Sequence, residues 1–315
     1  MAHLAHTMAY TGQTPWHGLG QQLIPHHPLE VWQRAAGMDW HIESSPVRFF
    51  NGSDVLHSFP EQQVLHRSDS HAPLAVVSSR YQVVQPREIL EFYRDLSEVS
   101  GFQLETAGVL KGGKKFWALA KTGQSAMLKG KDLVHGYLLL ATACDGTLST
   151  TAQFTSIRVV CNNTLRIALN DSDGAVKVSH RSTFDPDLIK RQLGIAVSSW
   201  DGFMARMKAL ADCHVSDTQA EHVLHKVLAS TVQGAGPQAP DKAFKAVMSL
   251  FQGGGMGSDL ASAQGTAWGL VNAITQYADH ERRARNVDYR LDSAWFGPGA
   301  QLKQQAWNEA LRLVA

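Results

Sequence analysis

The chain has 315 residues, of which 44% are hydrophobic, and its 29 lysines and arginines against 28 aspartates and glutamates give a net charge of +1. This length can bury a substantial core in one large domain or two modest ones, without disulfides or metals to stabilise it. The near-zero charge excludes a strong global field toward nucleic acid or membrane, so such a partner would meet a local patch.

The cysteines and the hydropathy pattern indicate a cytoplasmic protein. Cys144, Cys161 and Cys213 are widely spaced and form no C-x-x-C pair, which argues against a disulfide framework and a zinc knuckle. No apolar run reaches the roughly 20 residues of a membrane helix, and the first residues lack the layout of a signal peptide. We therefore expect a reducing compartment and no membrane partner.

The first part of the chain is predicted to be irregular and then mainly β-structure. Residues 1–27, rich in His, Gly and Pro, are expected to form an irregular arm. A short helix is expected over 28–36, and a hairpin over 40–65 turns at Asn51-Gly52, where both residues tolerate positive φ. Further short strands are predicted over 74–77 and 81–84.

The next part is predicted to be a helix followed by a four-stranded antiparallel meander. Apolar residues at helical spacing predict an amphipathic helix over 86–97, ending before Gly101 and lying on a sheet. The predicted strands are 102–110, 115–121, 136–143 and 148–156. Glycine-containing turns at 111–114 and 145–146 favour this pairing.

After Asp185 the pattern becomes helical. Asp185 is a suitable N-cap, Pro186 fits the first helical position, and Ser216 with Gln219 forms a capping-box pattern. Helices are predicted over 185–211, 215–230, 241–251 and 258–278, with a last one after 297–299. We therefore predict an α+β fold, with an antiparallel β-meander packed by helices over 1–184 and a helical region over 185–315. A single continuous domain is the alternative.

The meander carries an uneven charge. From Leu104 to Arg166, eight lysines and arginines oppose three acidic residues, a local charge of +5. Such a cluster can hold phosphates, while aromatic residues such as Trp117 and Tyr137 can stack on unpaired bases. The alternative is that the lysines serve solubility and edge protection while the aromatics face the core.

Two further places are suited to an anion. The run from Arg158 to Arg166 is predicted to join a strand to a helix, with Asn163 or Thr164 as the cap and the free N–H groups beside Arg158. His180-Arg181 is better placed for an anion than for a metal. The alternatives are capping and packing at the first place, and plain solvent exposure at the second.

The remaining motifs predict no cofactor and no metal. His222 and His225 have ligand spacing on one helix, but no H-E-x-x-H or comparable pattern completes a site. The glycine run over 253–257 lacks the P-loop pattern and is interpreted as a flexible connector. The three arginines within 279–285 can touch phosphate, although a solvated surface is the commoner meaning of such a charge run.

Several short segments together resemble a family of phage- and plasmid-borne proteins of uncharacterised function. They are W-H-G-L-G at 16–20, G-M-D-W at 37–40, Y-Q-V-V-Q at 81–85, E-T-A-G at 105–108, R-V-V-C-N-N-T-L at 158–165, K-V-S-H-R at 177–181 and S-A-W-F-G-P-G-A-Q-L-K at 293–303. The resemblance covers the chain from about residue 14 onward and implies a mobile-element setting.

The order of helix, basic meander and helical C-terminal half also resembles single-strand annealing proteins of the Red-beta, RecT and Erf kind. That resemblance implies ATP-independent binding and annealing of single-stranded DNA by a homo-oligomer, a ring or filament. The residues predicted to contact nucleic acid are Lys111, Lys114, Lys115, Trp117, Tyr137, Arg158, Asn163, Arg166, His180 and Arg181. The alternative is a protein-interaction, anti-defence or regulatory factor; an enzyme is third, because no catalytic motif is visible.

Overall fold

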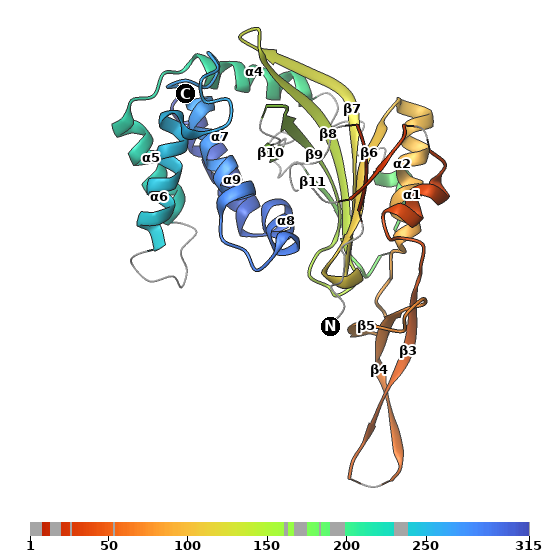
Figure 1. Ribbon diagram of the computed structural model, residues 1–315. Coiled ribbons are helices and arrows are strands. Elements are labelled where there is room, and N and C mark those ends of the chain that lie inside the picture. The colour runs from red at the N-terminus through yellow and green to blue at the C-terminus, as the bar shows by residue number, and fades with distance from the viewer. Residues whose placement is uncertain are drawn as a thin grey trace. The chain divides into compact units, whose positions relative to one another are not determined.

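The computed structural model has the predicted α+β architecture, with mixed sheets that include antiparallel strands and a helical C-terminal region (Figure 1). It describes residues 8–12, 20–25, 27–52, 54–160, 163–166, 175–182, 184–189, 199–229 and 239–314. Within these ranges, every helix is too short or too polar to cross a bilayer.

The chain forms two compact units, each assembled from separate stretches of sequence. Unit 1 comprises Met1–Gly123, Leu138–Gln153 and Ala175–Ile195, and unit 2 comprises Gln124–Tyr137, Phe154–Gly174 and Ala196–Ala315. The units are interleaved because three strands of the meander begin in one unit and end in the other.

The predicted meander is confirmed. Its strands are β6 (Gln103–Leu110), β7 (Lys115–Leu128), β8 (Asp132–Ala143) and β9 (Thr150–Arg158), which neighbour one another in that order. The β6–β7 turn uses positive φ at three successive residues: 53° at Lys111, 69° at Gly112 and 104° at Gly113. Glycine adopts this backbone at low cost, which is why a Gly-Gly pair marks the turn in the sequence.

The predicted irregular N-terminal arm is wrong in part, because it supplies two strands to unit 1. β1 (Met8–Thr11) pairs antiparallel with β6, and β2 (Gln21–Leu23) pairs parallel with β1. Pairing satisfies backbone groups that β6 would otherwise leave open at the sheet edge. On the opposite side of the unit 1 sheet, β11 (Ala175–Val178) pairs with β9.

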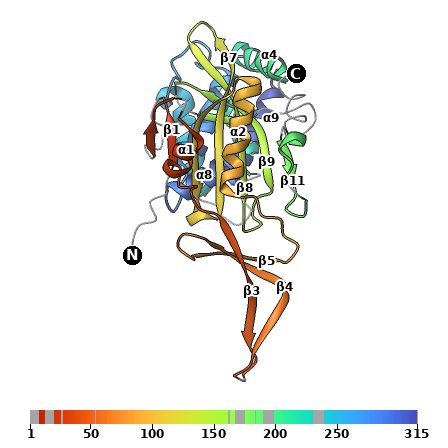
Figure 2. The same cartoon turned by 90° about the vertical axis from the view of Figure 1, so that its right-hand side faces the viewer.

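The amphipathic helix is confirmed as α2 (Pro86–Ser100), which lies across the face of the unit 1 sheet (Figure 2). A capping box between Gln85 and Glu88 begins it, and Gly101 ends it at a φ of 68°. The buried Tyr93 hydroxyl lies 2.9 Å from the carbonyl oxygen of Ala118 and 2.8 Å from that of Leu138. This hydroxyl therefore ties the helix to β7 and β8. The shorter α1 (Leu29–Ala35) packs against α2.

A second sheet in unit 1 forms a projecting arm. It consists of β3 (Ile42–Phe50), β4 (Leu56–Arg67) and β5 (Pro73–Ser78), paired antiparallel in that order. The outer part of the β3–β4 hairpin extends away from the other elements of unit 1 in both views (Figures 1 and 2). The hairpin predicted at Asn51-Gly52 is thus confirmed. The strand predicted over 81–84 is wrong, because this segment has no regular structure.

Unit 2 is mainly helical, as predicted for the C-terminal region. Its helices are α4 (Ser199–Asp212), α5 (Asp217–Ala229), α6 (Ala239–Ser249), α7 (Ala267–Gln276), α8 (Val287–Phe296) and α9 (Pro298–Leu311), with the π-helical turns η2 (Leu250–Gly254) and η3 (Tyr277–Glu281). All ten residues of α7 are buried, and the helix contacts α4, α6 and α9. A helix that is buried on every side lies in the core of its unit.

Two helix starts confirm the caps expected from the sequence. The Asp185 carboxylate accepts hydrogen bonds from the N–H groups of Asp187 and Leu188, and the chain is helical from residue 186 to 189. At the start of α5, Ser216 and Gln219 exchange the hydrogen bonds of a capping box. The middle of the helix predicted over 185–211 lies outside the described residues, and the one predicted from 258 begins at 267.

We expect Gly269→Ala to destabilise the protein and Gly202→Ala to stabilise it, although both glycines lie in helices. A Cβ on Gly269 would lie 1.8 Å from the carbonyl oxygen of Ala263, whereas one on Gly202 would meet nothing within 4 Å. Overpacking costs about 1–3 kcal/mol or more, and removing an exposed helical glycine gains about 0.5–1 kcal/mol. Urea denaturation of both variants measures the difference, and equal midpoints would contradict the close approach at Gly269.

Candidate nucleic-acid interface

Four arginines of unit 2 line one cavity of about 450 Å³, called here the arginine pocket. Arg282, Arg283 and Arg285 come from the loop between η3 and α8, and Arg290 comes from α8 itself. Asp292 also lines the cavity. With four positive side chains against one negative, the lining of the pocket favours an anion, since planar guanidinium groups can bind phosphate through paired hydrogen bonds.

The loop that carries these arginines is fixed at both ends. The Arg282 N–H donates to the carbonyl oxygen of Tyr277 at 2.8 Å, where η3 ends. The Asn286 side chain accepts from the N–H of Tyr289 at 3.0 Å and caps α8. The arginine side chains between these points are therefore presented from a loop with anchored ends.

One atom of the arginine pocket lacks a partner. The Nη1 of Arg282 is buried and has no hydrogen-bond acceptor among the described residues. A buried donor left unsatisfied costs about 1–3 kcal/mol, and more when the group is charged. An anion that reached this nitrogen would remove this cost.

An exposed aromatic ring lies beside the same arginines. Tyr289 lines the pocket and is 41% exposed, and the guanidinium carbon of Arg285 lies 5.4 Å from the centre of its ring. Aromatic rings next to basic groups are the usual platform for unpaired bases. The pocket thus combines a place for phosphate with a surface for stacking.

Two of the predicted lysines and His180-Arg181 gather at one end of the unit 1 sheet, called here the loop end. The carbonyl oxygen of Lys114 accepts from the N–H of Cys144 at 2.9 Å, so the β6–β7 turn adjoins the β8–β9 turn. His180 contacts the other side of that turn, with its Nε2 2.9 Å from the carbonyl oxygen of Leu148. Lys111 and Lys114 are partly exposed and Arg181 is exposed.

Tyr81 joins these segments. Its hydroxyl donates to the carbonyl oxygen of Ala143 at 2.8 Å, and its ring stacks on His180 with the centroids 4.6 Å apart. Arg67 lies beside Gly113 of the β6–β7 turn. It is less available to an outside anion, because it donates two hydrogen bonds to Asp69. These hydrogen bonds lower the pKa of Asp69 to about 2.

Cys144, at the same end, is unsuited to act as a nucleophile. Burial raises the pKa of its thiol to about 12, and the nearby Asp145 raises it further. Since the thiolate is the reactive form, this cysteine is protonated and inert at neutral pH.

Four of the predicted contact residues are buried, which corrects their expected roles. Lys115, Trp117, Tyr137 and Arg158 are exposed by 3%, 0%, 3% and 2%, respectively. Strand residues alternate between the two faces of a sheet, and the sequence cannot tell which of these faces becomes buried. Trp117 and Tyr137 therefore offer no stacking face, and Lys115 and Arg158 no free charge, to a ligand at the surface.

The expected helix start at Asn163 is also wrong. Residues Asn163–Arg166 form strand β10, which pairs antiparallel with β9. The N–H and hydroxyl of Thr164 donate to the Asp279 carboxylate at 3.0 and 3.2 Å, so no helical N–H groups are free for an anion. The side chains of Asn163 and Arg166 lie outside what the structure describes.

The glycine run over 253–257 is held by hydrogen bonds rather than acting as a plain connector. The guanidinium of Arg158 donates to the carbonyl oxygens of Met256 and Gly257 at 3.4 and 3.0 Å. The Met256 N–H donates to the Gln276 side chain at 2.8 Å. The glycines permit this approach: a Cβ on Gly257, whose φ is +67°, would lie 2.7 Å from Val160.

Sequence reasoning found part of the arginine pocket and missed the rest. The charged run over 279–285 signalled phosphate contacts, but Arg290 and Tyr289 follow on a helix that was not predicted. The Asn286 cap, four residues before Arg290, was a usable signal for that helix.

Comparison with known proteins identifies a family but no characterised relative. Residues 73–295 match the family described as Domain of unknown function (DUF932), which covers more than half of the chain. No curated protein and no solved structure matches the chain. The match includes the meander, β10 and the four arginines of the arginine pocket. The chain therefore belongs to the DUF932 family.

Proposed function

We propose that this protein binds single-stranded DNA and anneals it to a complementary strand without nucleotide hydrolysis, as a homo-oligomer serving a phage or plasmid. The arginine pocket carries the proposal, with its buried Arg282 nitrogen that lacks an acceptor. A backbone phosphate has the charge and the oxygen acceptors that this group requires.

The chemistry of the pocket favours a single strand over a duplex. Tyr289 can stack on an unpaired base while Arg283 and Arg285 hold the adjoining phosphates. In a duplex the bases are stacked on each other and paired, so the ring would have no partner. The tyrosine thus takes the role that the sequence had suggested for Trp117 and Tyr137.

The loop end offers a second group of phosphate contacts through Lys111, Lys114 and Arg181. A strand held by its phosphates keeps the pairing edges of its bases free for a complementary strand. Repetition of such contacts along an oligomer would extend the held strand. This supports annealing by positioning alone, which needs no cofactor.

We expect Arg283→Gln/Arg285→Gln to weaken binding of a single-stranded oligonucleotide in fluorescence anisotropy. A hydrogen bond to a charged group contributes about 1.5–3 kcal/mol, so each lost contact should reduce affinity about tenfold or more. The slope of log K against log salt should become shallower by about 0.7 per lost phosphate contact on a single strand. Arg87→Gln/Arg94→Gln removes two exposed arginines from α2 and is the matched control.

Two results would refute the proposal. One is the absence of single-strand binding by the unaltered protein at about 50 mM salt, a concentration at which phosphate contacts are strong. The other is equal affinity of both double variants. Size measurement with and without the oligonucleotide tests the oligomer, which should grow when the strand is added.

A second candidate function is supported by the arm. Its tip exposes several large apolar side chains: Phe49, Phe50, Val55, Leu56 and Phe59. Large apolar side chains exposed together at one hairpin tip favour a protein-binding surface. If the protein is instead an interaction or regulatory factor, Phe49→Ser/Phe50→Ser should abolish binding of its protein partner. Arg283→Gln/Arg285→Gln should leave that binding intact.

A further inference from the structure

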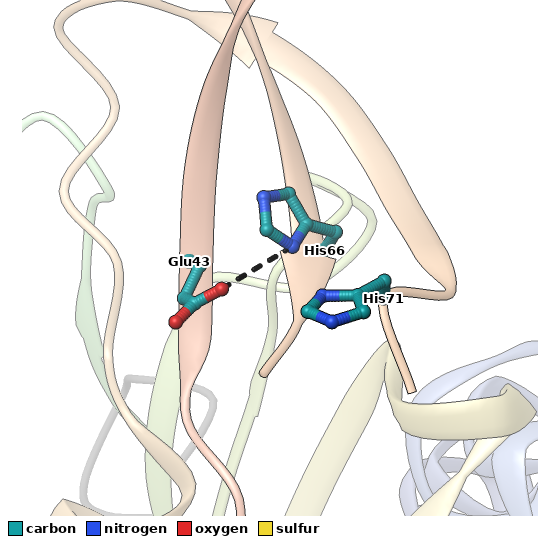
Figure 3. A group of neighbouring side chains, drawn as sticks. All are labelled: Glu43, His66 and His71. Atoms are coloured by element: carbon teal, nitrogen blue, oxygen red, sulfur yellow. Dashed lines mark ion pairs between the residues drawn. The ribbon is translucent and has the colours of Figure 1, made fainter. Parts of the chain in front are cut away.

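Three potential metal ligands meet on the arm. Glu43 lies on β3, His66 lies on β4, and His71 lies just before β5. Figure 3 shows the Glu43 carboxylate and the His66 ring directed toward each other, with the His71 ring close by. One donor atom from each residue lies within 4.8 Å of the other two.

The strand pairing places the first two ligands at a distance suited to a shared ion. Glu43 and His66 are direct partners in the β3–β4 register. Glu43 Oε2 lies 3.6 Å from His66 Nδ1, which is too long for a hydrogen bond. Two ligands each about 2.0–2.1 Å from a tetrahedral zinc ion lie about 3.3 Å apart. A contraction of a few tenths of an ångström would therefore suffice for both to bind one ion.

Glu43 and His66 each contact a neighbouring side chain through the polar atom that does not face the other. Ser45 Oγ lies 2.9 Å from His66 Nε2, so a proton on Nε2 would be donated to Ser45 and the Nδ1 lone pair would be free. That Nδ1 is buried and has no hydrogen-bond partner in the part of the chain that the structure describes. On the carboxylate, Glu43 Oε1 lies 3.2 Å from His41 Nε2. Such outer contacts accompany metal-binding histidines and carboxylates and set their orientation.

The third ligand is presented by an unusual backbone. His71 has a φ of 54°, a left-handed conformation uncommon for residues other than glycine. The turn is closed by hydrogen bonds from the His71 N–H to Arg67 and from the Arg67 N–H to Ala72, at 3.0 and 3.1 Å. This conformation places the His71 ring 6.2 Å from that of His66, centre to centre.

We propose that Glu43, His66 and His71 bind one zinc ion. Two imidazoles and one carboxylate suit zinc better than magnesium or calcium, which prefer oxygen ligands throughout. Three protein ligands leave a fourth position for water or another donor atom, and the exposed His71 leaves that side accessible. The ion would fasten β3, β4 and the β4–β5 turn together. This site is independent of the proposed DNA contacts.

The test is a calorimetric titration of the chelator-treated full chain with Zn²⁺ alone. We expect one ion per chain at this site, lost in the double variant His66→Gln/His71→Asn. Asparagine tolerates the left-handed backbone at residue 71, so the variant removes the ligand without adding strain. Ser45→Ala should weaken binding about 10- to 100-fold, the usual effect of losing an outer contact, and the double variant should weaken it more.

The histidine control is His57→Gln, on the same strand but stacked on Phe49 rather than facing the cluster. It should bind zinc as the unaltered chain does. Co²⁺ should give the visible absorption of tetrahedral coordination in the unaltered chain and in this control. If the double variant disrupts the arm, the test passes to Glu43→Gln. This variant should lose zinc binding while amide exchange shows that its strands remain paired. Equal zinc stoichiometry and affinity in the double variant and the unaltered chain would overturn the proposal, as would no zinc binding at all.

Discussion

Replacing Arg158 with methionine is expected to lower the free energy of unfolding by about 3–5 kcal/mol. Its guanidinium Nε donates to Asp132 Oδ1 at 2.7 Å, and the two side chains are 2% and 0% exposed. Removing one partner of a buried ion pair leaves the other charge without compensation, which costs more than the pair itself contributes. Methionine keeps much of the length, so the lost volume contributes little.

The surroundings of Asp132 sharpen this prediction. Its second oxygen accepts from the Ser262 hydroxyl at 2.6 Å and the Trp268 indole at 3.0 Å. Adding Asp132→Leu to Arg158→Met removes the buried carboxylate that has lost its positive partner. It also leaves the Ser262 hydroxyl and the Trp268 indole without an acceptor. We therefore expect the double variant to recover only part of the loss.

Urea denaturation measures both effects. The control is Arg87→Met, which breaks the exposed pair of Arg87 with Glu91 on α2 and should change stability by at most about 0.5 kcal/mol. A loss in Arg158→Met no larger than in this control would contradict the stabilising role of the buried Arg158–Asp132 pair.

Replacing Lys303 with methionine should lower the free energy of unfolding by a similar amount, roughly 3–5 kcal/mol, because the Asp279 carboxylate would stay buried without its positive partner. Lys303 Nζ donates to Asp279 Oδ1 at 2.6 Å and to the Thr164 hydroxyl at 2.7 Å. Both charged side chains are buried, at 6% and 1% exposure. This network joins β10 to η3 and α9, so β10 should also lose protection from amide exchange.

A nearby surface pair provides the comparison. Lys226 lies 3.9 Å from Glu309 and is half exposed, so Lys226→Met should change unfolding by at most about 1 kcal/mol. Equal urea midpoints for the two lysine variants, or unchanged exchange of β10 in Lys303→Met, would contradict the role given to Asp279.

Single residues in the sequence predicted much of the local structure. Gly101 ends α2, Asp185 caps its helix and Ser216 begins α5, because each side chain or backbone preference acts within one turn of the chain. The Gly112-Gly113 turn likewise fixed a hairpin of the meander. Short strands such as β1 and β10 were missed, since four residues carry too little pattern to distinguish a strand from a loop or helix start.

The residues of the candidate sites were harder to predict from the sequence, because the sites depend on which residues become buried. Lys115 and Arg158 look like surface charges in the sequence, and only packing encloses them and pairs Arg158 with Asp132. Charge type alone cannot report burial.

By itself the sequence determined the α+β class, the meander, most of the helices and the run of arginines after Asp279, because these follow from periodicity, capping and composition. Only the tertiary structure decided where chemistry-bearing side chains meet. It set Arg290 beside the loop arginines, and the β3–β4 register set Glu43 opposite His66. Such meetings bring together separate elements of the fold, so no local pattern in the chain encodes them.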